Sequence, residues 1–316
     1  MLKHNEIPLT GLIGSSPLGA LAAFGLIRIC REISDLSGAR LYWLRDLDGI
    51  PTDDWFAVLS VTNGVNRVEL VEKLADHQKN RSFNVFEWSK DIRVSSEEYK
   101  ELLRKHAESS NLHDRSDADY FTAFGSEIVK DGSKGLVKPT AFHMTSGQQK
   151  FLDNIHKMGD ALRLDDSCKY AFKEALFGPW RYQDLYHSLG WDPSTERQHA
   201  MRDRAPSSEN PRCVLGAVWL AVESIPLFPT AVSRGRLLTT GFSTKAKVTK
   251  LVWPIWTRPI GVDALRTLLM TSDLLSGNES CETLTRRGVA AVYQAVRSEF
   301  GKGYAILRPA NLVWCV

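Results

Sequence analysis

The sequence predicts an α+β fold built from mixed, mainly antiparallel sheets with a helical region. Strand-like alternation and helix-like spacing follow one another along the chain without the regular βαβα order of a doubly wound sheet. No internal repeat or low-complexity tract interrupts this order. The pattern divides into an N-terminal α+β region (1–140), a mainly helical middle region (141–223) and a basic C-terminal α+β region (224–316).

The first predicted element is a helix over residues 15–33. Ser15 or Ser16 can cap it, and Pro17 suits its first position. Its first three turns are apolar on all sides, which indicates burial against several neighbours or a protein–protein interface. Gly19 and Gly25 lower helix propensity and are explained if another backbone packs closely there.

The remaining elements follow from periodicity and capping signals. In the first region, strands are predicted at 39–44, 55–61 and 82–88, helices at 67–78 and 95–108, and a long loop or hinge over 109–140. Further helices are predicted at 147–158, 167–177, 213–222, 261–271 and 282–299. A strand pair is expected from 235–242 and 247–256, and two final strands at 304–308 and 311–316.

The composition is that of an ordinary globular protein. The 316 residues are 43% hydrophobic and 24% charged, which argues against intrinsic disorder. The net charge is only +3, so any affinity for nucleic acid must come from local patches. The five cysteines are widely spaced and form no C-x-x-C pair, which indicates reduced thiols. Without a signal-peptide pattern or a membrane-spanning apolar run, the expected location is cytoplasmic.

Catalytic and metal-binding motifs are missing from the sequence. The glycines at 11, 14 and 19 match neither nucleotide-binding pattern, the eight histidines have no zinc spacing, and G-x-S-x-G does not occur. The sequence therefore predicts no catalytic residue, metal or cofactor. Two pairs of acids, Asp117 with Asp119 and Asp165 with Asp166, leave a metal-dependent nuclease as an alternative.

The strongest positive signal is an acid-free window. No Asp or Glu occurs from Ser224 through Val262, while six basic residues do: Arg234, Arg236, Lys245, Lys247, Lys250 and Arg258. Hydroxyl side chains such as Thr239 and three aromatic rings lie among them: Phe242, Trp253 and Trp256. Basic residues neutralise phosphates, hydroxyls fix register and aromatics stack on bases, so the window predicts contact with nucleic acid. The strand pair is expected to place Lys245, Lys247 and Thr249 on one face.

Two further segments are candidates for the same role. A second basic group contains Arg197, Arg202 and Arg204, with Arg212 after it. In "MTSGQQ" (144–149), Thr145 and Ser146 can donate to a phosphate at a helix N-terminus, and Gln148 and Gln149 can read a base edge or a 2′-hydroxyl. The alternative is a simple N-cap with solvated glutamines.

Five motifs in this order resemble a known family. They are "LTGLIGSSPLGALAAFGLIRI", "MTSGQQKFL", "LGWDPSTERQHAMR", "WLAVESIPLFPT" and "WPIWTRPIGVDALRTLL". Together they resemble the large-subunit-type proteins of subtype I-G (formerly I-U) CRISPR–Cas effector complexes, of the Cascade type.

The resemblance implies a non-catalytic subunit in antiviral defence. Such a subunit binds the CRISPR RNA 5′ end, touches the short duplex motif beside the target DNA, assembles with other Cas subunits and helps recruit a helicase-nuclease. Base pairing then supplies sequence specificity, while protein contacts supply position. Besides the nuclease, a scaffold that binds only protein, with its basic window facing an acidic partner, stays open as an alternative.

Overall fold

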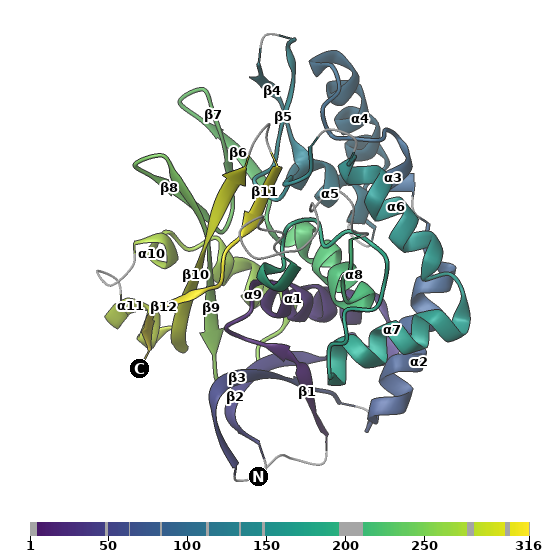
Figure 1. Ribbon diagram of the computed structural model, residues 1–316, viewed down its shortest axis with the longest axis vertical. Helices are drawn as coiled ribbons and strands as arrows, with labels where there is room; N and C mark the ends of the chain where they lie inside the picture. The colour runs from purple at the N-terminus through teal and green to yellow at the C-terminus, as the bar shows by residue number, and fades with distance from the viewer. Residues whose placement is uncertain are drawn as a thin grey trace, which may run out of the picture.

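Helices and several mainly antiparallel sheets alternate along the chain, which confirms the predicted α+β fold. The computed structural model describes residues 5–47, 50–62, 64–82, 84–111, 114–132, 134–146, 149–195, 211–276, 281–300 and 304–315. Figure 1 shows most helices on one side of the molecule and the largest sheet on the other, with two apolar helices between them.

The two central helices are α1 (Pro17–Glu32) and α8 (Leu215–Ser224), and both are buried along almost their whole length. As predicted, the Ser16 side chain caps α1 and Pro17 is its first residue. A Cβ atom added to Gly25 would lie 1.7 Å from the carbonyl oxygen of Leu220, so the two backbones are in direct contact. The apolar N-terminal segment is therefore a core helix.

The N-terminal sheet has three antiparallel strands. These are β1 (Glu6–Ile13), β2 (Arg40–Leu47) and β3 (Ile50–Ser60), in the order β1-β3-β2. The predicted strands at 39–44 and 55–61 thus exist, and the structure adds β1 in front of them.

The C-terminal sheet has five strands, and its central pair is formed by β9 and β10. The bounds are β8 (Phe242–Lys245), β9 (Val248–Trp256), β10 (Val289–Phe300), β11 (Tyr304–Leu307) and β12 (Asn311–Cys315). β8 pairs with β9, while β11 and β12 both pair with β10. The indole N–H groups of Trp253 and Trp256 donate to the backbone oxygens of Gly14 and Leu41, at 2.8 and 2.7 Å. These two bonds join the C-terminal sheet to the N-terminal region.

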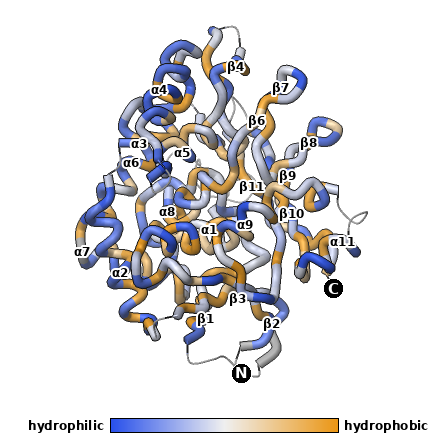
Figure 2. The backbone as a smooth tube through the Cα atoms, turned by 180° about the vertical axis from the view of Figure 1, so that it is seen from behind, coloured by the Kyte–Doolittle hydropathy of each residue, from blue (hydrophilic) through white to orange (hydrophobic). Residues whose placement is uncertain are grey.

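The remaining elements surround this centre. The helices are α2 (Arg67–Asn80), α3 (Asn84–Glu87), α4 (Ser96–Ser109), α5 (Ser116–Phe124), α6 (Phe151–Ala161), α7 (Asp165–Phe177), α9 (Val262–Leu269), α10 (Ser272–Leu275) and α11 (Cys281–Arg286). Two hairpins pair β4 (Gly125–Asp131) with β5 (Leu136–Pro139) and β6 (Thr230–Ser233) with β7 (Arg236–Thr239). Figure 2 shows that the outer helices carry hydrophilic residues along much of their length, which is typical of helices that cover a core.

All three predicted regions contribute to one contiguous hydrophobic core, with Leu9, Phe151 and Trp253 as examples. All five cysteines are free thiols, and Cys30, Cys168 and Cys213 pack as buried apolar groups. Among the described residues, no helix combines the length and the apolar character needed to cross a bilayer.

Two predictions in the first region are wrong. Residues 84–87 form the short helix α3 where a strand was expected. Val85 and Phe86 are adjacent and both buried in the same core, whereas neighbouring side chains of a strand point to opposite faces. The predicted loop over 109–140 contains α5, β4 and β5. The polar residues of this segment suggested a loop, but the apolar side chains around Phe121 and Phe124 bury α5.

Two predictions in the last region are also wrong. The expected helix over 282–299 is α11 followed by β10, because Gly288 adopts a φ of +84° and turns the chain. The expected pairing of 235–242 with 247–256 is replaced by two hairpins. β7 pairs with β6, and β9 pairs with β8, with Gly241 at a φ of +75° between the two hairpins. The additional turn at Gly241 allows two short hairpins in place of one long hairpin.

A buried ionic network lies beside the two central helices. The Glu223 carboxylate on α8 is fully buried and accepts hydrogen bonds from Arg28 at 2.8 Å and from Arg81. Arg28 also pairs with Glu32 at 3.0 Å, and the His77 imidazole lies 3.2 Å from the Glu32 carboxylate. Burial alone would raise the pKa of Glu32, but His77 and the charges of Arg28 and Arg81 outweigh burial and lower that pKa to about 2.

We expect the free energy of unfolding of the Glu32→Gln variant to depend less on pH at acid pH than that of the wild type. A carboxylate with a lowered folded pKa stabilises the protein above its unfolded pKa of about 4.3. That contribution is lost as the pH falls from there toward 2. The Glu32 side chain is 31% exposed, so solvent screens part of the effect. Urea unfolding across this pH range should give a shallower slope for Glu32→Gln than for the wild type. The exposed Glu72→Gln serves as control, and equal slopes for all three proteins would contradict the assignment.

We expect Trp253→Ala to lower the free energy of unfolding by about 3–5 kcal/mol, because it removes a buried ring and leaves a cavity. Trp253 is only 1% exposed, and the change also leaves the Gly14 carbonyl without its donor. Val248→Ala on the same strand, where the side chain is 42% exposed, should cost less than about 0.5 kcal/mol. Urea denaturation monitored by circular dichroism measures both, and a stable Trp253→Ala protein would refute the core role.

Candidate nucleic-acid interface

Two β-hairpins, β6–β7 and β8–β9, carry most of the basic residues of the acid-free window. We call them the basic hairpins (230–239 and 242–256). Figure 1 shows their turns projecting from the same side of the molecule. Arg234, Arg236, Lys245 and Lys247 lie at or beside these turns, and all four are exposed. The fold thus gathers at two neighbouring tips the charges that the sequence spreads along the window.

The first basic hairpin is fixed at its base. The Thr230 hydroxyl donates to the carbonyl oxygens of Thr122 and Gly125, both at 2.9 Å. Directly across the hairpin, the Thr239 hydroxyl accepts from the Ala141 N–H at 3.0 Å. These bonds attach the hairpin to the end of α5, the start of β4 and the segment just after β5, and they leave the tip exposed. Thr239 therefore holds the hairpin in place, where the sequence suggested a phosphate contact.

The turn of the second basic hairpin has an unusual sequence. Ala246 and Lys247 connect Lys245 to its cross-strand partner Val248, with φ angles of +49° and +67°. Two positive φ angles are typical of a type I′ turn, which normally selects Asn and Gly. A non-glycine residue in this region carries a conformational cost.

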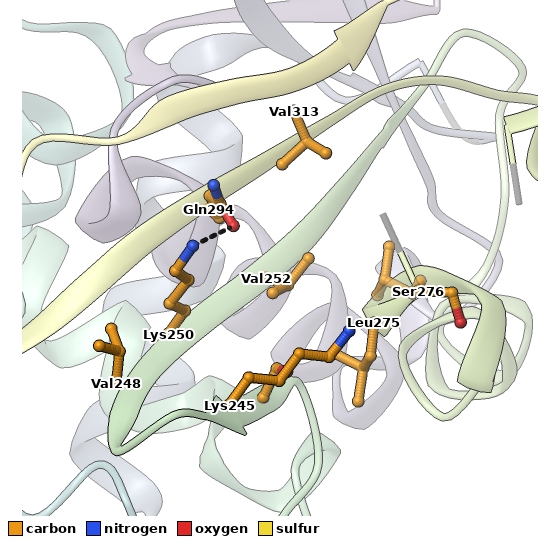
Figure 3. Close-up of a pocket in the computed structure, with 10 residues that line it drawn as sticks. Lys245, Val248, Lys250, Val252, Leu275, Ser276, Gln294 and Val313 are labelled. Atoms are coloured by element: carbon orange, nitrogen blue, oxygen red, sulfur yellow. Dashed lines mark hydrogen bonds between the residues drawn. The ribbon is translucent and has the colours of Figure 1, made fainter. Parts of the chain in front are cut away.

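Lys245 and Lys250 line a groove on the outer face of the C-terminal sheet, which we call the lysine groove (Figure 3). It has a volume of about 480 Å³ and receives residues from β8, β9, α10, β10 and β12. The Lys250 ammonium donates to the Gln294 side-chain oxygen at 3.3 Å. Val252, Leu275 and other apolar residues form the floor, and none of the lining residues that the structure describes carries a carboxylate.

The six basic residues of the window share one electrostatic property. Within the described part of the chain, none of them lies within ion-pair distance of a carboxylate. Elsewhere, several exposed arginines are paired: Arg104 with Glu101 and Arg286 with Glu282 are examples. The positive charge of the basic hairpins is therefore not neutralised by neighbouring side chains.

Two details of the predicted surface are wrong. Lys247 lies in the turn, and Thr249 faces away from Lys245, since it pairs across the hairpin with Thr244 at 3.0 Å. Lys245 shares its face with Lys250 instead. The three aromatic rings that lie among the basic residues are buried, with Trp253 and Trp256 at 1% and 2% exposure, so they belong to the core and cannot stack on bases.

The other basic candidates do not join the basic hairpins in the described structure. Arg258 is exposed but follows the opposite end of β9. Arg212 is exposed just before α8. Arg197, Arg202 and Arg204 lie outside the described residues.

The "MTSGQQ" segment does not cap a helix. Helix α6 begins at Phe151, so neither Thr145 nor Ser146 is its N-cap. Thr145 is fully buried, and its hydroxyl has no hydrogen-bond partner among the described residues. The Ser146 carbonyl accepts from the Gln149 N–H at 3.2 Å, both residues are half-buried, and Gln148 lies outside the described residues. Thr145 is therefore not a surface ligand for a phosphate.

The two acid pairs are not arranged as a metal centre in the described residues. Both oxygens of the Asp119 carboxylate accept from arginines, Arg115 at 2.8 Å and Arg266 at 3.2 Å. Asp117 lies 3.5 Å from the His106 imidazole. Asp165 and Asp166 begin α7, in another part of the chain. Where the structure describes the chain, no group of three or more His, Cys, Asp or Glu side chains has the geometry to hold a metal ion.

Sequence reasoning missed a third hairpin, β4–β5, and the groove residue Gln294. β4 packs against β6 and β7, and its hairpin carries Lys130, Lys134 and Lys138. Because the sequence predicted a loop for these lysines, their proximity to the basic hairpins could not be predicted. The available signal was the pair of glycines at 132 and 135, both at a φ of +66°, which mark a turn between two short strands.

No protein-family model, no curated protein and no solved structure matches this chain. The geometry of the basic hairpins and the lysine groove therefore carries the functional argument.

We expect Ala246→Gly to raise the free energy of unfolding by roughly 0.5 kcal/mol. Relief of the left-handed conformation contributes about 1–2 kcal/mol, and the greater freedom of glycine in the unfolded chain offsets about 0.4–1 kcal/mol of it. Lys247→Gly should give a similar gain but remove a tip charge. Urea denaturation measures both variants, and a loss of stability in both would contradict the type I′ assignment.

Proposed function

We propose that this chain is a non-catalytic, nucleic-acid-binding subunit of a type I CRISPR effector complex. The observation that carries the binding function is the set of basic residues on the basic hairpins without carboxylate partners in the described structure. Unpaired lysines and arginines at exposed tips are available for phosphate oxygens, and their binding releases condensed counterions from the nucleic acid.

The shape of the basic hairpins suits contact with a phosphate backbone. The base of the first hairpin is fixed by the Thr230 and Thr239 hydrogen bonds, so its tip presents charge without ordering a flexible loop first. Such contacts carry position and affinity, and they do not read the base sequence. This matches a complex in which a guide strand reads the sequence by base pairing.

The place in a CRISPR effector rests on the resemblance of the five sequence motifs to the subtype I-G large-subunit-type proteins. On this proposal the partners are a CRISPR RNA, target double-stranded DNA, other Cas subunits and a recruited helicase-nuclease. The proposed location is the cytoplasm, where such complexes meet invading DNA.

We expect charge reversal at Lys245 and Lys247 together to weaken binding of RNA or DNA and leave the fold intact, because both side chains are exposed. The slope of log Kd against log salt should fall by at least about 1.4, since each lost phosphate contact contributes about 0.7–0.9. Fluorescence anisotropy across a salt series measures this. The matched control reverses Lys100 and Lys105, two exposed lysines of α4. If both double variants bind like the wild type at every salt concentration, the basic hairpins are not the interface.

We expect tagged protein purified from its native host to carry short RNAs of uniform length with a common 5′ end, together with other Cas proteins. Sequencing of the RNA and mass spectrometry of the eluate test this directly. Recovery of acidic proteins without nucleic acid would favour the scaffold alternative. Recovery of the chain alone would remove the effector assignment, and metal-dependent nuclease assays on Asp117 and Asp166 variants would follow.

A further inference from the structure

The lysine groove differs from the tips of the basic hairpins because it combines charge with an apolar floor. Lys245 is exposed at its rim, and Lys250 is half-buried and oriented by Gln294 at 3.3 Å. Between them lie apolar side chains of the sheet and of α10, with Val252 only 5% exposed and Leu274 only 1% exposed. Figure 3 shows both lysines and Gln294 on the same face as Val252 and Val313.

The apolar floor of the lysine groove and its two lysines suit two different chemical groups. An apolar floor favours a flat, weakly hydrated group, while two ammonium groups without carboxylate partners in the described structure favour an anion. The Gln294 amide adds a hydrogen-bonding group beside Lys250. A volume of about 480 Å³ lies within the range of small-ligand sites.

We infer that the lysine groove holds a single unpaired nucleotide, with its base on the apolar floor and its phosphate at Lys245 and Lys250. The inference rests on the proposed nucleic-acid function and makes it more specific. A base stacked and paired inside a duplex cannot reach the floor, so the groove selects single-stranded nucleic acid or an extruded base. The hairpin tips, which contact only phosphates, accept both forms.

The placement of Lys245 connects the two sites. It ends β8 beside the turn of the second hairpin and also lines the groove, and its cross-strand partner Val248 lines the same groove. A strand that follows the tips of the basic hairpins therefore reaches the groove through Lys245. Since the floor contains Val and Leu but no aromatic ring, the base packs by apolar contact without ring stacking.

A groove-filling variant tests this inference. Ser243 lines the groove, and Ser243→Trp occupies it without changing any charge. Ser233→Trp places the same ring on the exposed first hairpin, outside the groove, and is the matched control. Binding of a short labelled single strand and of a blunt duplex of the same length is measured by fluorescence anisotropy. Thermal melting verifies that each variant folds.

We expect the wild type to bind the single strand about tenfold more tightly than the duplex, a difference of about 1.4 kcal/mol in binding free energy. Ser243→Trp should remove this preference and leave duplex affinity unchanged, while Ser233→Trp should keep the preference. Gln294→Leu, which keeps the shape and removes the amide, should reduce single-strand affinity only.

Failure of the groove inference and failure of the proposed binding function give different results. Equal affinity for both probes, unchanged by Ser243→Trp and Gln294→Leu, would overturn the groove inference and leave the proposed binding function standing. Absence of binding to either probe at low salt would overturn the proposed function and the groove inference with it.

Discussion

Direct backbone contact between α1 and α8 is the constraint on which the rest of the structure depends. Gly25 has no space for a side chain, because the Leu220 carbonyl occupies its position. The same approach places Glu223, one turn beyond Leu220, against Arg28, one turn beyond Gly25. Arg81 completes the site from the end of α2. A charge buried this deeply is tolerated only with such partners, so helix packing and the ionic network require each other.

The positions of the basic hairpins depend on the contact between α1 and α8. Helix α8 leads through a short turn into β6, and Thr230 at the start of β6 bonds to the end of α5. On the other side, Trp253 and Trp256 tie β9 to the N-terminal region through hydrogen bonds to Gly14 and Leu41. Both hairpins therefore extend from rigid elements. Their tips project away from the core, and in the described part of the chain their basic side chains form no ion pair with a carboxylate.

Local signals in the sequence were sufficient for the capped helices and the basic surface. Ser16 and Ser95 fixed the starts of α1 and α4, and the missing acids identified the window. Signals that depend on tertiary structure were not sufficient. The burial of Trp253 and the presence of Gln294 in the groove depend on the pairing of β9 with β10, which are tens of residues apart. The face shared by Lys245 and Lys250 depends on the register of the β8–β9 hairpin. A one-residue change of register reverses the face of every side chain, so alternation alone could not assign them.

The two turns show how the chain places charge at the tips at a conformational cost. In the first hairpin, glycine occupies one of the two positive-φ positions, at 235, and Arg234 occupies the other. In the second hairpin neither position is glycine, since Ala246 and Lys247 occupy both. A turn selected only for stability would carry Asn-Gly in both places. The proposed function accounts for basic side chains at positions where stability favours glycine, because strained residues are common at functional sites. On that proposal, the sequence feature that weakens each hairpin is also the one assigned to phosphate contact.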